Sequence, residues 1–354
     1  MGDSQDLIRT QVRSFLTSGN AQIFQIPLQV FPGFWGYAYL VLYDDPQHGP
    51  YRVLIDTGSG MDHSNEDLEA GLQKVGELLG SPLGLQDLTH IFITHGHIDH
   101  FGGLSYVRPR TKALVGVHEL DQRNLTNYEE RLAVVARRLD EFLMEAGVSP
   151  DRRRSLIDMY LLTKSLYHSV RVDFTYEAAG MRVGPFEMLH VPGHCAGQVV
   201  IRLHDVLFSG DHVLMDTSPH QSPEQLTLST GLEHYLQSLE KLRVWAPDVR
   251  LTLGGHKDPI LDLTARLDEI ILLHASRLQQ VLDLLTDPHT IKEVSEALFG
   301  EVHGYNVLLA LEEAGAHVEY LYNRSQLGIH NLSQLENGNG PVPIRYFRLG
   351  DGRE

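Results

Sequence analysis

The sequence predicts an α/β protein with two β-sheets packed face to face, helices outside them, and a separate helical region at the C-terminal end. Two observations lead to this prediction. Before residue 262, strand-like runs form two successive series interrupted by helix-like segments. After residue 262, apolar residues recur at helical spacing. The length of 354 residues suits one large domain, expected over residues 1–262, and a smaller one over 263–354.

The composition is that of a globular protein. It also argues against membranes and nucleic acids as binding partners. Hydrophobic residues make up 42% of the chain and charged residues 21%, which excludes a disordered or collagen-like protein. No apolar run approaches the ~20 residues that cross a bilayer, and no basic-then-apolar leader opens the sequence. We therefore expect a cytoplasmic protein without a membrane partner. A net charge of -17 argues against nucleic acid as a partner, because such a surface repels phosphate backbones.

Residues 22–58 are typical of three strands. The run 22–31 alternates apolar and polar residues, 38–43 is rich in β-formers, and 51–55 ends in a turn. Between the first two strands we expect an aromatic loop over residues 31–36, which contains Phe31, Phe34 and Trp35. These rings either pack against the core or form a wall of a substrate pocket.

The middle of the chain predicts more strands around a helical insert. A helix is expected over residues 66–80, and strands over 88–94 and 113–117. Residues 119–168 carry apolar residues at helical spacing, broken at Ser149-Pro150-Asp151, and predict an inserted helical hairpin. Strands then resume over 182–191, 198–203, 206–208 and 249–253.

The C-terminal region predicts a winged-helix module. Helices are expected over residues 267–285, 305–311 and 318–327, with a capping box from Thr290 to Glu293 opening another helix after the first of these. A turn at 337–340 leads into a final strand over 344–349. Acidic residues outnumber basic ones here, so this module is expected to pack on the core or contact another subunit rather than bind nucleic acid.

The segment from Thr94 to Gly103 carries the clearest chemical signal. Four potential metal ligands follow a strand within six positions: His95, His97, Asp99 and His100. An extended backbone that turns into a glycine-containing loop can direct such side chains into one cavity. Three ligands with an open position make a catalytic zinc site, and two such sites can share a bridging carboxylate.

Three further ligand candidates lie at expected strand ends. Each directly follows a glycine: His194, Asp211 and His256. The alternative, scattered surface histidines, explains one such residue but not seven candidates in four glycine-flanked loops. The sequence therefore predicts two divalent metal ions. Imidazoles with carboxylates suit zinc first, although iron or manganese could occupy the same ligands.

This pattern resembles the metallo-β-lactamase superfamily, whose fold is a four-layer αββα sandwich. The resemblance covers about residues 20–262, and all five sequence blocks of the superfamily occur in order. It implies that one metal is held by His95, His97 and His194. It implies that the second is held by Asp99, His100 and His256, with Asp211 bridging the two. It also implies that Asp56 supports the site from behind the ligands.

The sequence departs from the pattern of several branches of the superfamily, which narrows the branches that it can belong to. Flavodiiron oxygen reductases have a glutamate at the position of His97 and a flavodoxin domain that is absent here, and true β-lactamases lack the bridging aspartate. The C-terminal region resembles the winged-helix extension of a hydrolase branch that includes β-lactamase-like ribonucleases. What remains is similar to glyoxalase II-like hydrolases, lactonases and small phosphodiesterases.

The resemblance implies a hydrolase in which a metal-bridging hydroxide attacks the substrate, with Asp99 as the catalytic residue that holds a metal and orients the hydroxide. His212 is expected either to support the site from behind or to be structural. Cys195 is either a nucleophile or, more simply, a small buried residue. His63, His118, His168 and His220 are expected to be surface or core histidines.

Three functions compete. The first is hydrolysis of a small-molecule thioester, ester or lactone, which the ligand set and the acidic surface favour. The second is a phosphodiesterase or endoribonuclease of the β-lactamase-like ribonuclease type, suggested by the winged-helix resemblance. The third is a non-catalytic metal-binding scaffold or sensor. The sequence leaves open whether the protein forms a homodimer, because the insert and the C-terminal region both offer apolar faces.

Overall fold

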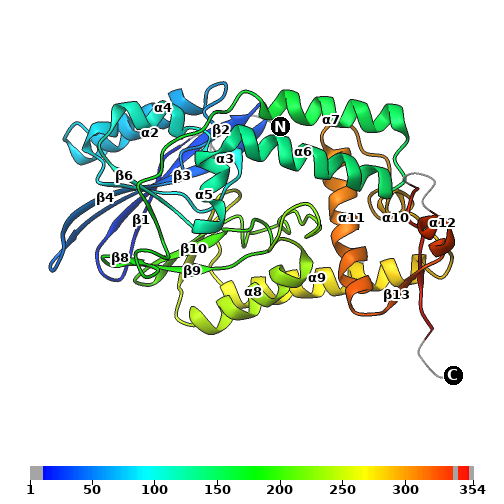
Figure 1. Cartoon of the computed structure of the whole chain (residues 1–354). Helices are drawn as coiled ribbons and strands as arrows, with labels where there is room; N and C mark the ends of the chain where they lie inside the picture. Colours follow the sequence, from blue (N-terminus) through cyan, green and yellow to red (C-terminus); the bar gives the residue numbers. More distant parts are fainter. Residues whose placement is uncertain (1–10, 338–341, 351–354) are drawn as a thin grey trace, which may run out of the picture. The chain divides into compact units, whose positions relative to one another are not determined.

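The computed structural model describes residues 11–337 and 342–350 and divides the chain into two compact units (Figure 1). Unit 1 contains the described parts of Met1–Tyr128, Tyr167–Pro219 and Lys241–Arg266. Unit 2 contains Glu129–Leu166, His220–Glu240 and the described parts of Leu267–Glu354. The expected linear division at residue 262 differs from this grouping, because each unit collects segments that are distant in the sequence.

Unit 1 contains a seven-stranded mixed sheet whose strands follow one another in chain order. The first three pairings, from β1 to β4, are antiparallel, and the next three, from β4 to β7, are parallel. Its strands are β1 (Arg13–Leu16), β2 (Gln22–Phe31), β3 (Phe34–Asp45), β4 (Gly49–Ile55), β5 (His90–Phe92), β6 (Leu114–Val117) and β7 (Phe174–Thr175).

The second sheet of unit 1 has five strands in the spatial order β12-β11-β10-β9-β8. They are β8 (Arg182–Val183), β9 (Phe186–His190), β10 (Val199–Leu203), β11 (Val206–Gly210) and β12 (Leu251–Gly254). The single strand expected over 182–191 is instead a tight hairpin of β8 and β9, in which Gly184 has a φ of 54°. That left-handed conformation reverses the chain at little steric cost because glycine lacks a Cβ.

The two sheets share one apolar core, which confirms the predicted face-to-face packing. Ile23 and Phe92 from the first sheet and Phe208 and Leu253 from the second belong to the same buried cluster. Strand β2 is also buried on its other face, where Ile26 lies against Gly71 of helix α2 (Ser64–Leu79). Alternating residues of β2 therefore serve the inter-sheet core and the helix layer.

Short helices follow the parallel strands of unit 1: η1 (Leu85–Asp87), α3 (Ile98–Phe101), α4 (Leu104–Val107), η2 (Arg108–Arg110) and α5 (Glu119–Thr126). The helical hairpin expected over residues 119–168 accounts for only part of that stretch. That stretch contains three helices, of which α5 lies in unit 1 and α6 (Tyr128–Glu145) and α7 (Pro150–Lys164) lie almost wholly in unit 2. The break at Ser149 is confirmed, because Ser149 is the N-cap of α7.

Unit 2 is mostly helical. Besides α6 and α7 it contains most of α8 (Leu232–Trp245), nearly all of α9 (Leu263–Leu284), α10 (Ile291–Phe299), α11 (Asn306–Asn323) and α12 (Leu332–Glu336). Strands β13 (Leu327–Ile329) and β14 (Tyr346–Arg348) pair antiparallel. The capping box is confirmed at α10, where Thr290 Oγ1 accepts from Glu293 N.

The expectations for unit 2 agree with the structure only in part. The helix expected to reach 327 ends at Asn323, and β13 follows it. Most of the predicted turn at 337–340 lies outside the described residues. The winged-helix assignment stays a prediction. Among the described residues, no helix combines the length and apolar character needed to span a bilayer.

Candidate metal centre

The candidate ligands follow the ends of strands in both sheets of unit 1. His95 and His97 follow the end of β5 by three and five residues, and the short helix α3 carries Asp99 and His100. His194 lies in the connection from β9 to β10. Asp211 directly follows β11, and His256 follows β12 by two residues. The sandwich thus brings seven side chains from four loops to one edge of the two sheets.

Three histidines form the first group of candidate ligands. One nitrogen from each of His95, His97 and His194 lies within 4.8 Å of the other two. His95 Nε2 is 3.1 Å from His97 Nδ1, and the rings of His97 and His194 have centroids 4.5 Å apart. This all-imidazole arrangement suits zinc with an open position for a water or substrate.

Two carboxylates and two histidines form the second group. Ligand atoms of Asp99, His100, Asp211 and His256 also lie within 4.8 Å of one another. His256 Nε2 is 3.3 Å from Asp99 Oδ2 and 3.4 Å from Asp211 Oδ2. Asp211 Oδ1 is 3.5 Å from His100 Nε2, while its Oδ2 is 3.9 Å from His194 Nε2. Asp211 therefore lies between the two groups, within reach of a ligand from each.

Hydrogen bonds behind the ligands fix which imidazole nitrogen faces the centre. His100 Nδ1 is 2.8 Å from Asp56 Oδ2, and Asp56 also accepts hydrogen bonds from Thr94 N and Thr94 Oγ1. His256 Nδ1 donates to the carbonyl oxygen of Trp35 at 2.7 Å. In both histidines Nε2 is thereby directed at the neighbouring carboxylates. Such partners are typical of metal-ligating histidines, and Asp56 lies directly behind His100.

The donor atoms fit a divalent cation. His100 Nε2, His256 Nε2 and Asp211 Oδ1 are buried and lie 3.3–3.5 Å from ligand atoms of the same group, but none of them makes a well-aligned hydrogen bond within the described residues. A cation between these atoms would satisfy them more fully than they satisfy one another. Imidazole nitrogens and carboxylate oxygens are donors that Zn²⁺ and similar ions accept.

The electrostatics of the second group lead to the same conclusion. Burial alone would raise the pKa of Asp99, yet His100 and His256 hold that pKa below its ordinary value. Burial would lower the pKa of His256, but the carboxylates of Asp211 and Asp99 raise it to about 10. Protons on the imidazoles thus balance the buried carboxylates, and a cation can take over this role.

Glycines beside the ligands make room for other ligands. A Cβ on Gly255 would clash with the ring of His100 and lie 2.5 Å from Asp211 Oδ1. A Cβ on Gly210 would lie 2.7 Å from Thr94 Oγ1, and Gly210 has a φ of 50°. These glycines are therefore required by the crowding of side chains around the centre.

The predicted aromatic loop is a tight hairpin instead. Strand β2 ends at Phe31 and β3 begins at Phe34, so only Pro32 and Gly33 form the turn. The Phe34 ring lies 4.6 Å from the ring of His256, and its residue is 44% exposed. Trp35 contacts the site through its carbonyl oxygen, whereas Phe31 faces Phe34 across the hairpin.

The remaining predicted residues lie near the ligands or within the core. His212 is fully buried beside Asp211, but it belongs to neither ligand group. Cys195 is buried, and its thiol donates to Asp121. Burial, and then the carboxylate of Asp121, raise the pKa of this thiol well above its ordinary value, which makes it a poor nucleophile. His118 is a buried histidine, as expected.

Sequence reasoning missed Asp121. This residue of α5 is completely buried, although an aspartate in the first turn of a helix is usually a solvated residue. The signal that could have found it is the pair Gly96 and Gly197, which flank ligand loops. A Cβ on Gly197 would lie 2.6 Å from Asp121 Cγ, so this glycine admits the carboxylate.

The family model for the metallo-beta-lactamase superfamily matches residues 35–256. The chain belongs to the metallo-beta-lactamase superfamily. The matched range begins at Trp35 and ends at His256, the last candidate ligand.

Similar proteins agree with this assignment to the metallo-beta-lactamase superfamily. A curated Bacillus subtilis protein named probable metallo-hydrolase YqjP is 25% identical over 289 residues, which cover 77% of this chain and 85% of the relative. A metallo-beta-lactamase family protein from Thermus thermophilus superposes with a TM-score of 0.71 at 26% identity, covering 92% of this chain and 98% of that one. A beta-lactamase domain protein from Burkholderia ambifaria gives 0.68 at 20% identity, with 95% and 94% covered, and shows the same fold.

Proposed function

We propose that this chain is a dinuclear metal-dependent hydrolase of a small-molecule thioester, ester or lactone. The observation that carries the proposal is the pair of adjacent ligand groups with Asp211 between them. Zinc is proposed first, because five of the seven candidate ligands are imidazoles. The curated relative named as a probable metallo-hydrolase supports the same reaction class.

The chain's own residues hold and orient the reactants. Divalent cations in such a site supply a Lewis acid and make a water molecule nucleophilic at neutral pH. Asp99 is the candidate proton carrier, because its side chain is 16% exposed while that of His100 is 2% exposed. A carboxylate oxygen of Asp99 can therefore reach a substrate, accept a proton from water and pass it to the leaving group.

The preference for an uncharged acyl substrate rests on the surroundings of the site. Phe34 presents an exposed aromatic ring beside His256, and such a ring binds apolar groups. The net charge of -17 disfavours long polyanions such as RNA. Both features favour a small acyl compound over a phosphodiester polymer.

The test combines metal analysis with a substrate screen on wild type and Asp99→Ala. We expect about two metal ions per wild-type chain, and turnover of thioesters, esters or lactones that a chelator abolishes and zinc restores. Asp99→Ala should lose on the order of 100-fold or more in kcat/KM. The exposed Asp248→Ala is the matched control and should behave as wild type.

Other outcomes would contradict the proposal. Turnover confined to phosphodiesters or RNA would support the phosphodiesterase alternative instead. Tight metal binding without turnover of thioesters, esters, lactones or phosphodiesters would support a scaffold or sensor. A wild-type protein that binds no metal would contradict the dinuclear centre itself.

A further inference from the structure

Asp121 is a completely buried carboxylate that contacts both loops of the three-histidine group. Its Oδ2 accepts a hydrogen bond from Gly96 N at 2.7 Å, between His95 and His97. Its Oδ1 accepts from Gly197 N at 3.0 Å, in the loop that carries His194. The thiol of Cys195, next to His194, lies 3.2 Å from Oδ2.

These contacts join segments that follow different sheets. Gly96 comes after β5 of the seven-stranded sheet, and Gly197 lies between β9 and β10 of the five-stranded sheet. Gly197 leaves room for this carboxylate, because a Cβ there would lie 2.6 Å from Asp121 Cγ. A Cβ on Gly96 would lie 2.5 Å from Asn124 Nδ2 and 3.1 Å from Asp121 Cγ, so this glycine leaves room first for Asn124, whose Nδ2 donates to Asp121 Oδ1 at 3.1 Å.

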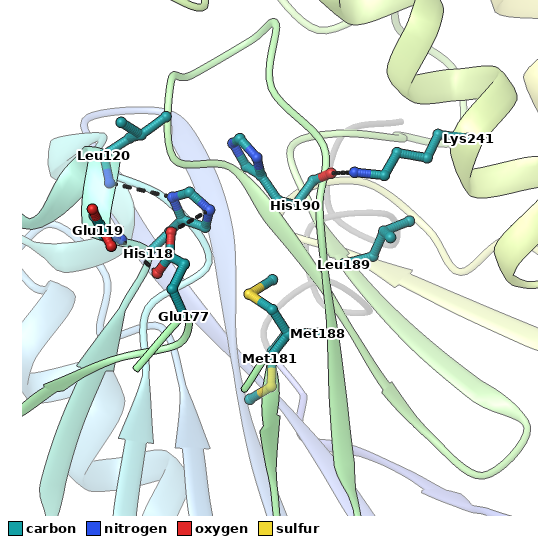
Figure 2. Close-up of a pocket in the computed structure, with 9 residues that line it drawn as sticks. All are labelled: His118, Glu119, Leu120, Glu177, Met181, Met188, Leu189, His190 and Lys241. Carbon is teal, nitrogen blue, oxygen red and sulfur yellow. Dashed lines mark hydrogen bonds and ion pairs between the residues drawn. The ribbon is translucent and has the colours of Figure 1, made fainter. Parts of the chain in front are cut away.

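The helix that carries Asp121 is itself held at its start. His118 is the N-cap of α5, and its Nδ1 accepts from Leu120 N. Its Nε2 pairs with Glu177 Oε1 at 2.7 Å, and its ring stacks on His190 with centroids 3.8 Å apart. Figure 2 shows these side chains around a cavity of about 530 Å³ in unit 1. Asp121 therefore projects from a fixed helix start, three residues after this cap.

We infer that Asp121 is a positioning residue that sets the distance between the His95–His97 loop and His194. The inference rests on the proposed metal centre and assigns Asp121 to the three-histidine group alone. The carboxylate can accept hydrogen bonds on both oxygens, which an amide cannot do. In Asp121→Asn, the amide nitrogen would face either Gly96 N–H or Gly197 N–H, so one of the two loops must move. Loss of such a supporting contact typically weakens metal binding 10–100-fold.

The test measures zinc affinity at one group at a time by competition with a chromophoric chelator. A His256→Ala background disables the four-residue group and leaves the three-histidine group. A His97→Ala background does the reverse. We expect Asp121→Asn to weaken zinc binding about 10–100-fold in the first background and less than about threefold in the second. The exposed Glu119→Gln, on the same helix, is the control and should change neither affinity.

Two further measurements keep the inference open to contradiction. Gly197→Ala leaves the carboxylate intact but displaces it, and should reproduce the selective loss. In the metal-free protein, hydrogen exchange should accelerate in peptides covering residues 94–98 and 194–198 of Asp121→Asn. Equal affinities in wild type and Asp121→Asn would overturn the inference. An equal loss at both groups, with a lower melting temperature of the metal-free protein, would overturn it too. Failure of wild type to bind zinc would instead refute the proposed metal centre.

Discussion

Two buried carboxylates outside the ligand set, Asp56 and Asp121, contact different parts of the metal centre. Asp121 contacts the backbone of the two histidine loops. Asp56 contacts the ring of His100 and the backbone amide and hydroxyl of Thr94. Asp56 also has a φ of 59°, a left-handed conformation that costs about 1 kcal/mol or more for a non-glycine residue. The surrounding contacts hold this aspartate in that conformation.

Asp56→Asn should weaken zinc binding mainly at the four-residue group. The amide can still accept from Thr94, but its nitrogen would then face the Nδ1 proton of His100 and turn this ligand away. We expect a loss of about 10–100-fold, measured by chelator competition in the His97→Ala background. A smaller loss is expected at the three-histidine group, because Thr94 Oγ1 also lies 3.0 Å from His95 Nδ1. Unchanged affinity at the four-residue group would contradict the role of Asp56, and Asp248→Asn is the matched control.

At this scale the sequence predicted what local patterns encode. Histidines two positions apart after a strand, and ligands preceded by glycine, are visible in the sequence, and the structure brings all seven candidates together. Asp121 could not be found in this way, because its hydrogen bonds are made to two loops that only the folded sandwich brings together. Cys195 was also readable only in part, since its contact with Asp121 depends on the same packing.

At the scale of elements, the β2–β3 hairpin carries Phe34 beside the candidate metal centre. The pair Pro32-Gly33 forms the turn, and Gly33 has a φ of 74°. This two-residue turn continues the pairing of the strands to Phe31 and Phe34. The expected loop of six residues is thus an extension of two strands, which holds the Phe34 ring beside His256. In the insert over residues 119–168, spacing likewise predicts helices, but not where one helix ends and the next begins.

Phe34→Ala should raise KM for an apolar acyl substrate with little change in kcat. The ring is 44% exposed and lies beside a candidate ligand without touching a reacting group, so it contributes equally to binding of substrate and transition state. We expect roughly a tenfold rise in KM, which corresponds to about 1.4 kcal/mol of lost apolar contact. Steady-state kinetics on a series of acyl chain lengths provide the measurement. A fall in kcat at unchanged KM would contradict this role, and the exposed Val244→Ala is the control.

At the scale of the whole molecule, the two units are each assembled from distant segments. In unit 2, Phe142 of α6 belongs to the same apolar cluster as Val281 of α9 and Leu311 of α11. Helical spacing in the sequence predicted that each of these helices has an apolar face. It could not predict which helix packs against which. The linear division of the chain could therefore be proposed from the sequence, whereas the grouping of segments required the structure.

Unit 2 also buries a polar cluster that the sequence did not predict. His274 Nδ1 of α9 is 3.2 Å from His317 Nε2 of α11, and His317 Nδ1 donates to the Glu313 carbonyl oxygen at 2.7 Å. Ligand atoms of these three residues lie within 4.8 Å of one another, as in the two groups of unit 1. Here Arg277 donates to Glu313 Oε1 at 2.9 Å and already balances the carboxylate. We therefore interpret the cluster as a chain of hydrogen bonds through two neutral imidazoles.

Acidification should loosen unit 2 around this cluster. Burial lowers the pKa of His274 to about 3, although Glu313 opposes the shift, and burial lowers the pKa of His317 as well. Between about pH 3 and 6.5 His274 binds more protons in the unfolded chain than in the folded one, so its contribution to stability falls as the pH falls, by at most about 1.4 kcal/mol per pH unit. The lowered pKa of His317 acts in the same direction. Hydrogen exchange of α9 and α11, corrected for intrinsic rates, should show less protection at pH 5 than at pH 7.5. His274→Gln removes one titrating group and should therefore reduce this pH dependence. His303→Gln is the control: the His303 side chain is 80% exposed, so this substitution should leave the pH dependence unchanged. Equal pH dependence in His274→Gln and wild type would show that the acid sensitivity of unit 2 arises from groups outside this cluster.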